Sequence, residues 1–183
     1  QCRSSTALIS NCVIQNCSDD HHGGGIDASR PDTFIRIHNC QVLNNSVLNS
    51  GGGIRIALNA MAEIAMCEII GNSCAHAGGG IWLEYSDGVR IFNCLMAENY
   101  SGWRGGGIAC DGTASEILNC TISSNSTGGT GIDYDGGINS LHESDLTISN
   151  SIIWANAPNQ IEYVGGFTGV NYSIIEGGWT GTG

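Results

Sequence analysis

The sequence predicts an all-β fold, a parallel β-helix of about six coils with 26–31 residues in each coil. Cysteine recurs at this interval, and an isoleucine lies three residues before each repeated cysteine. Three consecutive glycines followed by isoleucine recur once in each of the first four intervals. Within an interval the apolar residues alternate, as in Ile35-x-Ile37 and Ile54-x-Ile56, which is the period of a strand with one buried face.

Each coil is expected to contain three strands. One surrounds the Ile-x-x-Cys-x-Ile segment, one follows the glycines, and a third leads into the next copy, as in Thr33 to Ile37. Equivalent strands of successive coils should stack about 4.8 Å apart. Residues 1–183 are then one β-helix domain.

The repeated cysteines are predicted to form a buried column with one thiol per coil. Their constant phase relative to isoleucine favours small buried hydrophobes, a role that free cysteine fills well. The column comprises Cys12, Cys40, Cys67, Cys94 and Cys120, with Ser151 in the sixth place. Cys2, Cys17 and Cys74 fall outside it, and the sequence assigns them no pairing. No Cys-x-x-Cys or Cys/His pair has the spacing of a structural zinc site.

An asparagine five residues after each repeated cysteine forms a second predicted column. Its members are Asn45, Asn72, Asn99, Asn125 and Asn156, with Cys17 in the first coil. At a tight bend an Asn side chain can satisfy backbone groups and tolerates a left-handed conformation, and stacked amides can bond along the axis. Positive φ at a repeated corner accounts for the glycines in the same way. A phosphate-binding loop is not favoured because no helix follows them.

Composition limits the classes of partner. The chain has 17 acidic and 6 basic residues, a net charge of −11, and no lysine. Such a surface repels phosphate, so nucleic acid and anionic membranes are not expected partners. No apolar run is long enough to cross a bilayer. Because the chain begins with Gln1 and shows no polar or helical cap, we expect a fragment or a processed subunit.

These repeats resemble the passenger repeats of chlamydial-type polymorphic outer-membrane proteins, which carry Gly-Gly-Ala-Ile and Phe-x-x-Asn motifs. The first motif corresponds here to Gly-Gly-Gly-Ile at residues 23–26, 51–54, 78–81 and 105–108, and the second to Val42-x-x-Asn45 and its equivalents. The chain is also similar to secreted bacterial right-handed β-helix repeat proteins, notably at residues 150–154. The resemblance covers roughly residues 7–175. It implies right-handed coiling, an extracellular or cell-surface location, and adhesive or structural roles. Aliphatic residues replace the phenylalanine, and anchoring in an outer membrane is not implied.

The outward face of the strand after the glycines is the candidate ligand site. Asp27, Arg55 and Trp82 should stack one residue past the isoleucine, and Glu84 and Asp111 should be neighbours three residues past it. Two carboxylates about 5 Å apart could serve a retaining glycosidase, with Trp82 as a platform for a sugar ring. The alternative is that acidic residues simply occupy the wet face of a strand.

Other signatures of polysaccharide-degrading β-helices are missing. There is no lysine to act as a base, no Gly-His-Gly and no Arg-x-Lys. The dense polar cluster from Asp19 to His22 lies in a variable loop, where solvation alone explains it. The sequence therefore leans against an enzyme, and a polysaccharide-binding or polysaccharide-degrading β-helix remains the alternative to a structural one.

Calcium is the one cofactor that the sequence suggests. The fifth coil carries an insertion with Asp133-x-Asp135-Gly136, followed by Glu143 and Asp145, which could supply hard oxygen ligands. Neither a complete EF-hand loop nor an RTX nonapeptide is present.

The two ends of the predicted rod suggest a partner. Residues 7–9 are already in phase at the start, and residues 172–175 are strand-like near the finish. Open strand edges invite pairing, so end-to-end stacking of subunits into fibres is expected. The sequence thus predicts an extracellular structural or adhesive module.

Overall fold

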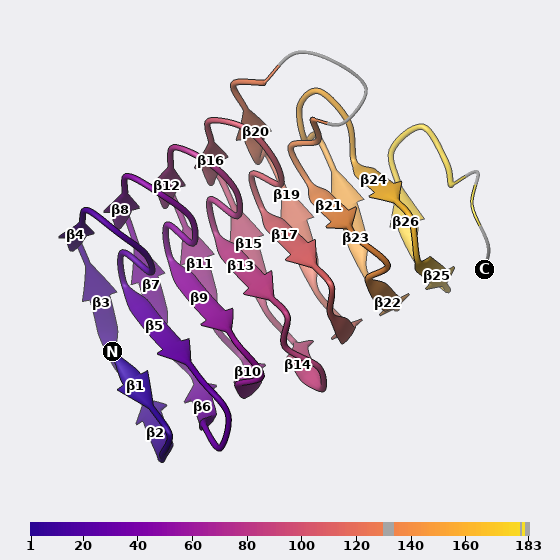
Figure 1. Ribbon diagram of the computed structural model, residues 1–183. Coiled ribbons are helices and arrows are strands. Elements are labelled where there is room, and N and C mark those ends of the chain that lie inside the picture. Colours follow the sequence, from indigo (N-terminus) through magenta and orange to yellow (C-terminus); the bar gives the residue numbers. More distant parts are fainter. Residues whose placement is uncertain (130–133, 180, 182–183) are drawn as a thin grey trace.

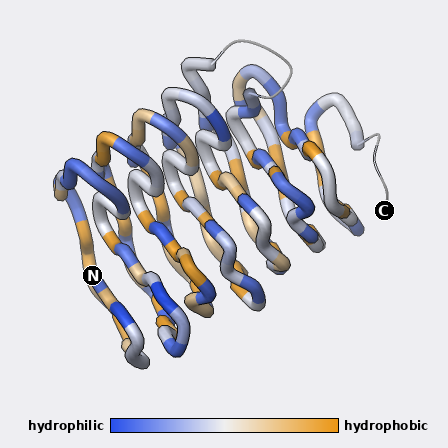
Figure 2. Tube along the Cα trace, viewed as in Figure 1, coloured by the Kyte–Doolittle hydropathy of each residue, from blue (hydrophilic) through white to orange (hydrophobic). Residues whose placement is uncertain are grey.

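The computed structural model describes residues 1–129, 134–179 and 181, and in these residues it is all-β, with every strand pair parallel (Figure 1). Successive coils stack into a rod with the N-terminus at one end and the C-terminus at the other, as the sequence predicts. Apolar residues recur at matching places in successive coils (Figure 2). In the described part of the chain, no helix has the length and apolarity to span a membrane.

Each of the first five coils contributes a strand to each of four sheets, and the last two contribute to sheets A, B and C. Sheet A contains β1 (Cys2–Arg3), β5 (Ile26–Ser29), β9 (Ile54–Ala57), β13 (Ile81–Glu84), β17 (Ile108–Asp111), β21 (Ile138–Leu141) and β24 (Ile161–Val164). Sheet B contains β2 (Thr6–Ser10), β6 (Phe34–His38), β10 (Met61–Ala65), β14 (Val89–Phe92), β18 (Ala114–Leu118), β22 (Asp145–Ser149) and β25 (Phe167–Asn171). Sheet C contains β3 (Val13–Gln15), β7 (Gln41–Leu43), β11 (Glu68–Ile70), β15 (Leu95–Ala97), β19 (Thr121–Ser123), β23 (Ile152–Trp154) and β26 (Ile174–Ile175). Sheet D contains β4 (Ser18–Asp19), β8 (Ser46–Val47), β12 (Ser73–Cys74), β16 (Tyr100–Ser101) and β20 (Ser126–Thr127).

The Ile-x-x-Cys-x-Ile segment is not a single strand. In the second coil, Ile37 belongs to β6 and Val42 to β7, and Asn39 turns the chain between them with φ 51°. Cysteine therefore lies at the corner between sheets B and C. The two-residue strands of sheet D were also missed, because two residues are too short to show a period.

The core fills the interior with in-phase isoleucines. Ile37, Ile64, Ile91, Ile117 and Ile148 are fully buried and lie in register on sheet B. Each side chain rests on its equivalent in the next coil, so the core repeats the coil spacing along the whole rod.

The cysteine column is buried in the inner coils but not at its start. Cys40, Cys67, Cys94 and Cys120 are at most 4% exposed, whereas Cys12 is exposed. The expectation for Cys12 is therefore wrong, because no described residue stacks on the outer side of the first coil. Within the column the Cys67 amide donates to the Cys94 sulfur at 3.4 Å. The Cys120 amide donates to the Ser151 hydroxyl at 3.1 Å, so serine takes the same role.

The asparagine column is a continuous chain of buried amides. The Asn99 Oδ1 accepts both the backbone amide and Nδ2 of Asn72, at 2.9 and 3.0 Å. The Asn99 Nδ2 donates to the carbonyl of Ile69 and to Asn125 Oδ1, both at 2.9 Å. All four hydrogen-bonding positions of this amide are thus filled. Asn45, Asn72 and Asn125 make the equivalent bonds in their own coils.

The column stops at a side-chain cap, a feature that the sequence analysis did not expect. Gln160 Oε1 accepts both Asn156 donors, at 3.2 and 2.8 Å. Gln160 Nε2 in turn donates to Glu176, whose carboxylate also accepts the Ala155 amide at 2.7 Å.

The left-handed residue at each of these corners is the one before the column asparagine. Asn44 has φ 52° and Glu98 has φ 58°, whereas Asn45 and Asn99 have no positive φ. The column amides therefore act through their hydrogen bonds, not through backbone tolerance.

Only the first glycine of each triplet needs a positive φ, for example Gly78 at 70°. The others are required by close approach: a Cβ on Gly79 would overlap the carbonyl oxygens of Tyr100 and Gly106. The glycine segment lies directly against the backbone of sheet D. Sheet D and the segments that follow it (residues 18–25, 46–53, 73–80 and 100–107) are called the ridge below; its turns form the upper border of the rod in Figure 1.

Candidate functional site

The outer face of sheet A is largely covered by the ridge. Ala77 of the ridge packs against Trp82 and Ala109 of sheet A in a small second core. The predicted row Asp27, Arg55, Trp82, Ala109 and Asn139 is in register as expected. Every member of that row is buried, however, and so are Ser29 and Ala57 of the next row.

Trp82 therefore does not present its ring to a ligand. It is 7% exposed and packs with the two alanines in one buried cluster. The expectation that it forms a sugar platform was wrong because strand periodicity shows which face a residue occupies, but not what packs on that face.

Arg55 holds three coils together. Its guanidinium contacts Asp27 of the preceding coil at 3.0 Å and Glu84 of the following coil at 2.6 Å. The side chains of Arg55 and Asp27 are each 8% exposed. Burial, and next the positive charge of Arg55, lower the pKa of the neighbouring His22, which favours a neutral imidazole. The cluster is therefore a largely buried ion network in which one guanidinium pairs with two carboxylates.

Glu84 and Asp111 are neighbours in register on β13 and β17, as the sequence analysis expected. Their carboxylates face different partners. Glu84 accepts a hydrogen bond from Arg55, while Asp111 lies 2.7 Å from Nδ1 of His142, which is exposed on the next coil. The Asp111–His142 pair escaped the sequence analysis because His142 lies in the irregular fifth coil.

Two exposed aromatic side chains, Tyr100 and Trp103, lie close together in sequence on the ridge. Trp103 is 46% exposed, and its ring lies 6.4 Å from that of His76 and 6.5 Å from that of Tyr134. The Arg104 guanidinium lies 4.7 Å from the centre of the Trp103 ring. Tyr100, also exposed, begins the same segment on β16. These five residues, Tyr100, Trp103, His76, Tyr134 and Arg104, are called the aromatic patch below.

The sequence carried one signal for the patch. Tyr100 and Trp103 occupy the variable segment between the column asparagine and the glycines, where coils differ most. Residues that break a repeat's consensus on one side of a solenoid often belong to its binding face.

The predicted calcium residues do not form one cluster in the described chain. Asp133 lies outside the described residues. Asp135 is buried three residues before β21 begins at Ile138, whereas Glu143 and Asp145 follow that strand and are exposed. Asp145 accepts the Phe167 amide at 3.1 Å. Among the described residues, no group of three or more His, Cys, Asp or Glu side chains is placed to hold a metal ion.

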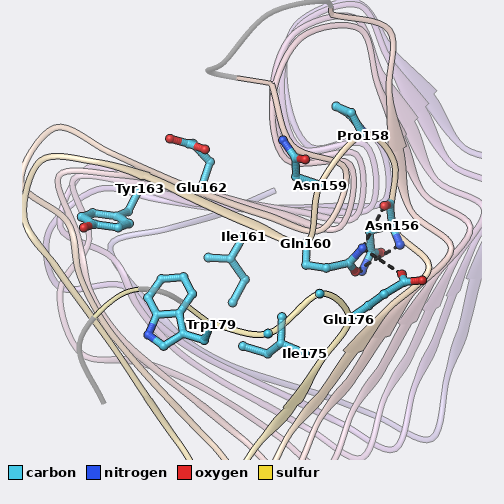
Figure 3. Close-up of a pocket in the computed structure, with 12 residues that line it drawn as sticks. Asn156, Pro158, Asn159, Gln160, Ile161, Glu162, Tyr163, Ile175, Glu176 and Trp179 are labelled. Atoms are coloured by element: carbon cyan, nitrogen blue, oxygen red, sulfur yellow. Dashed lines mark hydrogen bonds between the residues drawn. The ribbon is translucent and has the colours of Figure 1, made fainter.

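Both ends of the rod leave part of the core open. At the C-terminal end a cavity of about 710 Å³ is lined by Ile161, Ile175 and Trp179 (Figure 3). At the N-terminal end a cavity of about 620 Å³ is lined by residues that include Ile9, Ile14 and Arg3.

Comparison with known proteins agrees with this architecture. The family model described as "Right handed beta helix region" matches residues 1–176. No curated protein and no solved structure matches the chain. The stacked parallel coils and the extent of this match show that the chain belongs to the right-handed β-helix family.

Proposed function

We propose that this β-helix is an extracellular or cell-surface adhesive module that contacts carbohydrate through the aromatic patch. The observation that carries the proposal is the exposure of Trp103 and Tyr100 beside an arginine on one side of the rod. Aromatic rings offer the apolar faces of sugars a rigid contact surface, and polar groups at the ring edges fix orientation.

Charge narrows the class of carbohydrate. The chain carries a net charge of −11, so an extended polyanion would be repelled over most of the surface. Neutral glycans are therefore more compatible with this negatively charged surface than polyanionic glycans are. The extracellular location rests on the resemblance of the repeats to secreted β-helix proteins.

A binding role also suits the candidate acids. Glu84 is paired with Arg55, and Asp111 with His142, so each carboxylate already stabilises a contact between coils. In a purely adhesive rod these carboxylates hold neighbouring coils together and need not catalyse the cleavage of a bound glycan.

The test compares two tryptophans of similar exposure. Trp103→Ala should weaken binding to the best glycan of an array by at least ~10-fold, because truncation of a well-placed aromatic contact costs about 1.4 kcal/mol or more. Titration calorimetry measures the change. Trp154→Ala is the matched control, since Trp154 is 48% exposed on sheet C, away from the patch.

Equal loss in both variants, or no glycan binding by the wild-type chain, would overturn the proposal. Cleavage of the bound glycan that disappears in Asp111→Asn would instead indicate a polysaccharide-degrading enzyme.

A second candidate function is structural: end-to-end assembly into fibres. The open cavities at the two ends favour it. The N-terminal cavity is lined by Arg3 and Asp27, and the C-terminal cavity by Glu162 and Glu176, so Arg3 is the cation available to pair with the acidic C-terminal face.

A further inference from the structure

A sulfur-lined pocket lies at the corner between sheets B and C, away from the aromatic patch. It has a volume of about 290 Å³, and its lining includes Cys12, Cys40 and Met66. These three residues come from three successive coils, at the corners that precede β3, β7 and β11. The fold thus gathers two thiols and a thioether that are far apart in the sequence.

The two thiols are neighbours in the cysteine column. The Gln41 amide donates to the Cys12 carbonyl at 2.9 Å, which places the two corners one coil apart. Equivalent residues of adjacent strands lie about 4.8 Å apart. The two side chains thus start from adjacent coils, and this coil spacing is about twice the length of a metal–sulfur bond, which is about 2.3 Å.

Met66 departs from the pattern at its corner. The residue before the column cysteine is Asn11, Asn39, Asn93, Asn119 or Asn150 in the other coils, and all have a positive φ. Met66 has φ 53°, a conformation that methionine adopts rarely and asparagine adopts at lower cost. A residue held in an unfavourable conformation is a signal of function.

We propose that Cys12, Cys40 and Met66 bind a soft monovalent cation, Cu⁺ or Ag⁺. Thiolate and thioether sulfur favour such ions, whereas Ca²⁺ and Mg²⁺ require oxygen ligands. Structural zinc needs four nitrogen, oxygen or sulfur ligands in a tetrahedron. Glu68 also lines the pocket, but among the described residues it forms no metal-holding group with Cys12 and Cys40.

Binding exchanges protons for the ion. Each thiol loses one proton to solvent and keeps its electron pair for the metal bond, so two protons leave for each ion bound. The Cys12 and Cys40 thiols give up their hydrogen bonds to the carbonyls of Ser10 (3.1 Å) and His38 (3.3 Å). The two thiolates and the ion together carry one negative charge.

The experiment titrates the reduced, full-length chain with Cu⁺ under anaerobic conditions, in competition with a chromogenic Cu⁺ chelator. We expect one tightly bound Cu⁺ per chain. Loss of a supporting group near a metal costs about 10–100-fold in affinity, so Cys12→Ser, which removes a ligand, should cost at least ~100-fold. Met66→Leu keeps the side-chain size and should cost about 10-fold.

Two matched controls separate this pocket from general thiol binding. Cys17 is an exposed thiol that does not line the pocket, and Met61 has nearly the same exposure as Met66 on sheet B. Cys17→Ser and Met61→Leu should leave affinity within ~2-fold of wild type.

Three outcomes would overturn the proposal: unchanged affinity in Cys12→Ser, equal losses in Cys17→Ser, or displacement of Cu⁺ by equimolar Zn²⁺. Ag⁺ binding with the same dependence on the variants would support it. Far-UV circular dichroism of each variant shows whether the fold is retained.

Discussion

At the scale of single residues, the buried asparagines decide how coils adhere. An amide in the column, such as Asn99, bonds to the coil before it and the coil after it, and is fully buried. A buried polar group without a partner costs about 1–3 kcal/mol, so a broken column costs far more than one lost bond.

Asn99→Ala should therefore lower the free energy of unfolding by about 3–5 kcal/mol. The substitution removes the acceptor of two Asn72 donors and the side-chain donor to the Ile69 carbonyl, while Asn125 Oδ1 keeps only the backbone amide of residue 99. Urea unfolding followed by circular dichroism measures the loss.

The control for that variant is Asn93→Gly, at an exposed corner with φ 56° that glycine tolerates. Its cost should be below about 1 kcal/mol. Similar losses for both variants would mean that the column adds nothing to ordinary turn stability.

At the scale of elements, the backbone contact between the glycine segments of the ridge and sheet D depends on the absence of side chains. Gly79 has an ordinary φ but no room for a Cβ, while Gly88 has φ 75° and open space around it. Close approach and left-handed conformation can therefore be tested separately.

Gly79→Ala should cost about 2–3 kcal/mol, because the glycine segment must move away from sheet D. Gly88→Ala should cost only about 1 kcal/mol, the penalty of a left-handed alanine. Thermal or urea unfolding of both variants gives the comparison. A smaller loss for Gly79→Ala than for Gly88→Ala would contradict the close-contact explanation.

The repeat period was sufficient to predict the fold, because residues that recur in phase must stack. It did not predict the corner at Asn39, since the buried residues on its two sides, Ile37 and Val42, both point inward and mimic one continuous strand. It also could not show that Trp82 is covered, because the ridge packs on the outside of sheet A. The repeat period predicts the strands of one coil and the way that coils stack. The candidate sites, in contrast, are formed by segments whose sequence departs from the repeat.

At the scale of the whole molecule, the rod has two different ends. If the ends join, the contact is head to tail, with the C-terminal face of one copy on the N-terminal face of the next. Such a contact does not close and extends into a filament.

Two charged substitutions test this assembly. Ile9→Asp should block the N-terminal face and Ile175→Asp the C-terminal face, so each variant alone should be monomeric by light scattering. An equimolar mixture should form a one-to-one dimer, because each variant retains one intact face. A monomeric wild-type chain at about millimolar concentration, or dimers of either variant alone, would contradict head-to-tail joining.

Because each coil in the asparagine column bonds to the next in the same way, the length of this rod can be counted in whole coils. If residues 67–93 were excised, Met66 would join Cys94, Ile64 would stack on Ile117 and Asn45 would meet Asn99. Each new contact would replace one of the same kind. A gene for such a chain can thus gain or lose a whole coil without inventing a new interior, and natural variation in length should come in coil-sized steps.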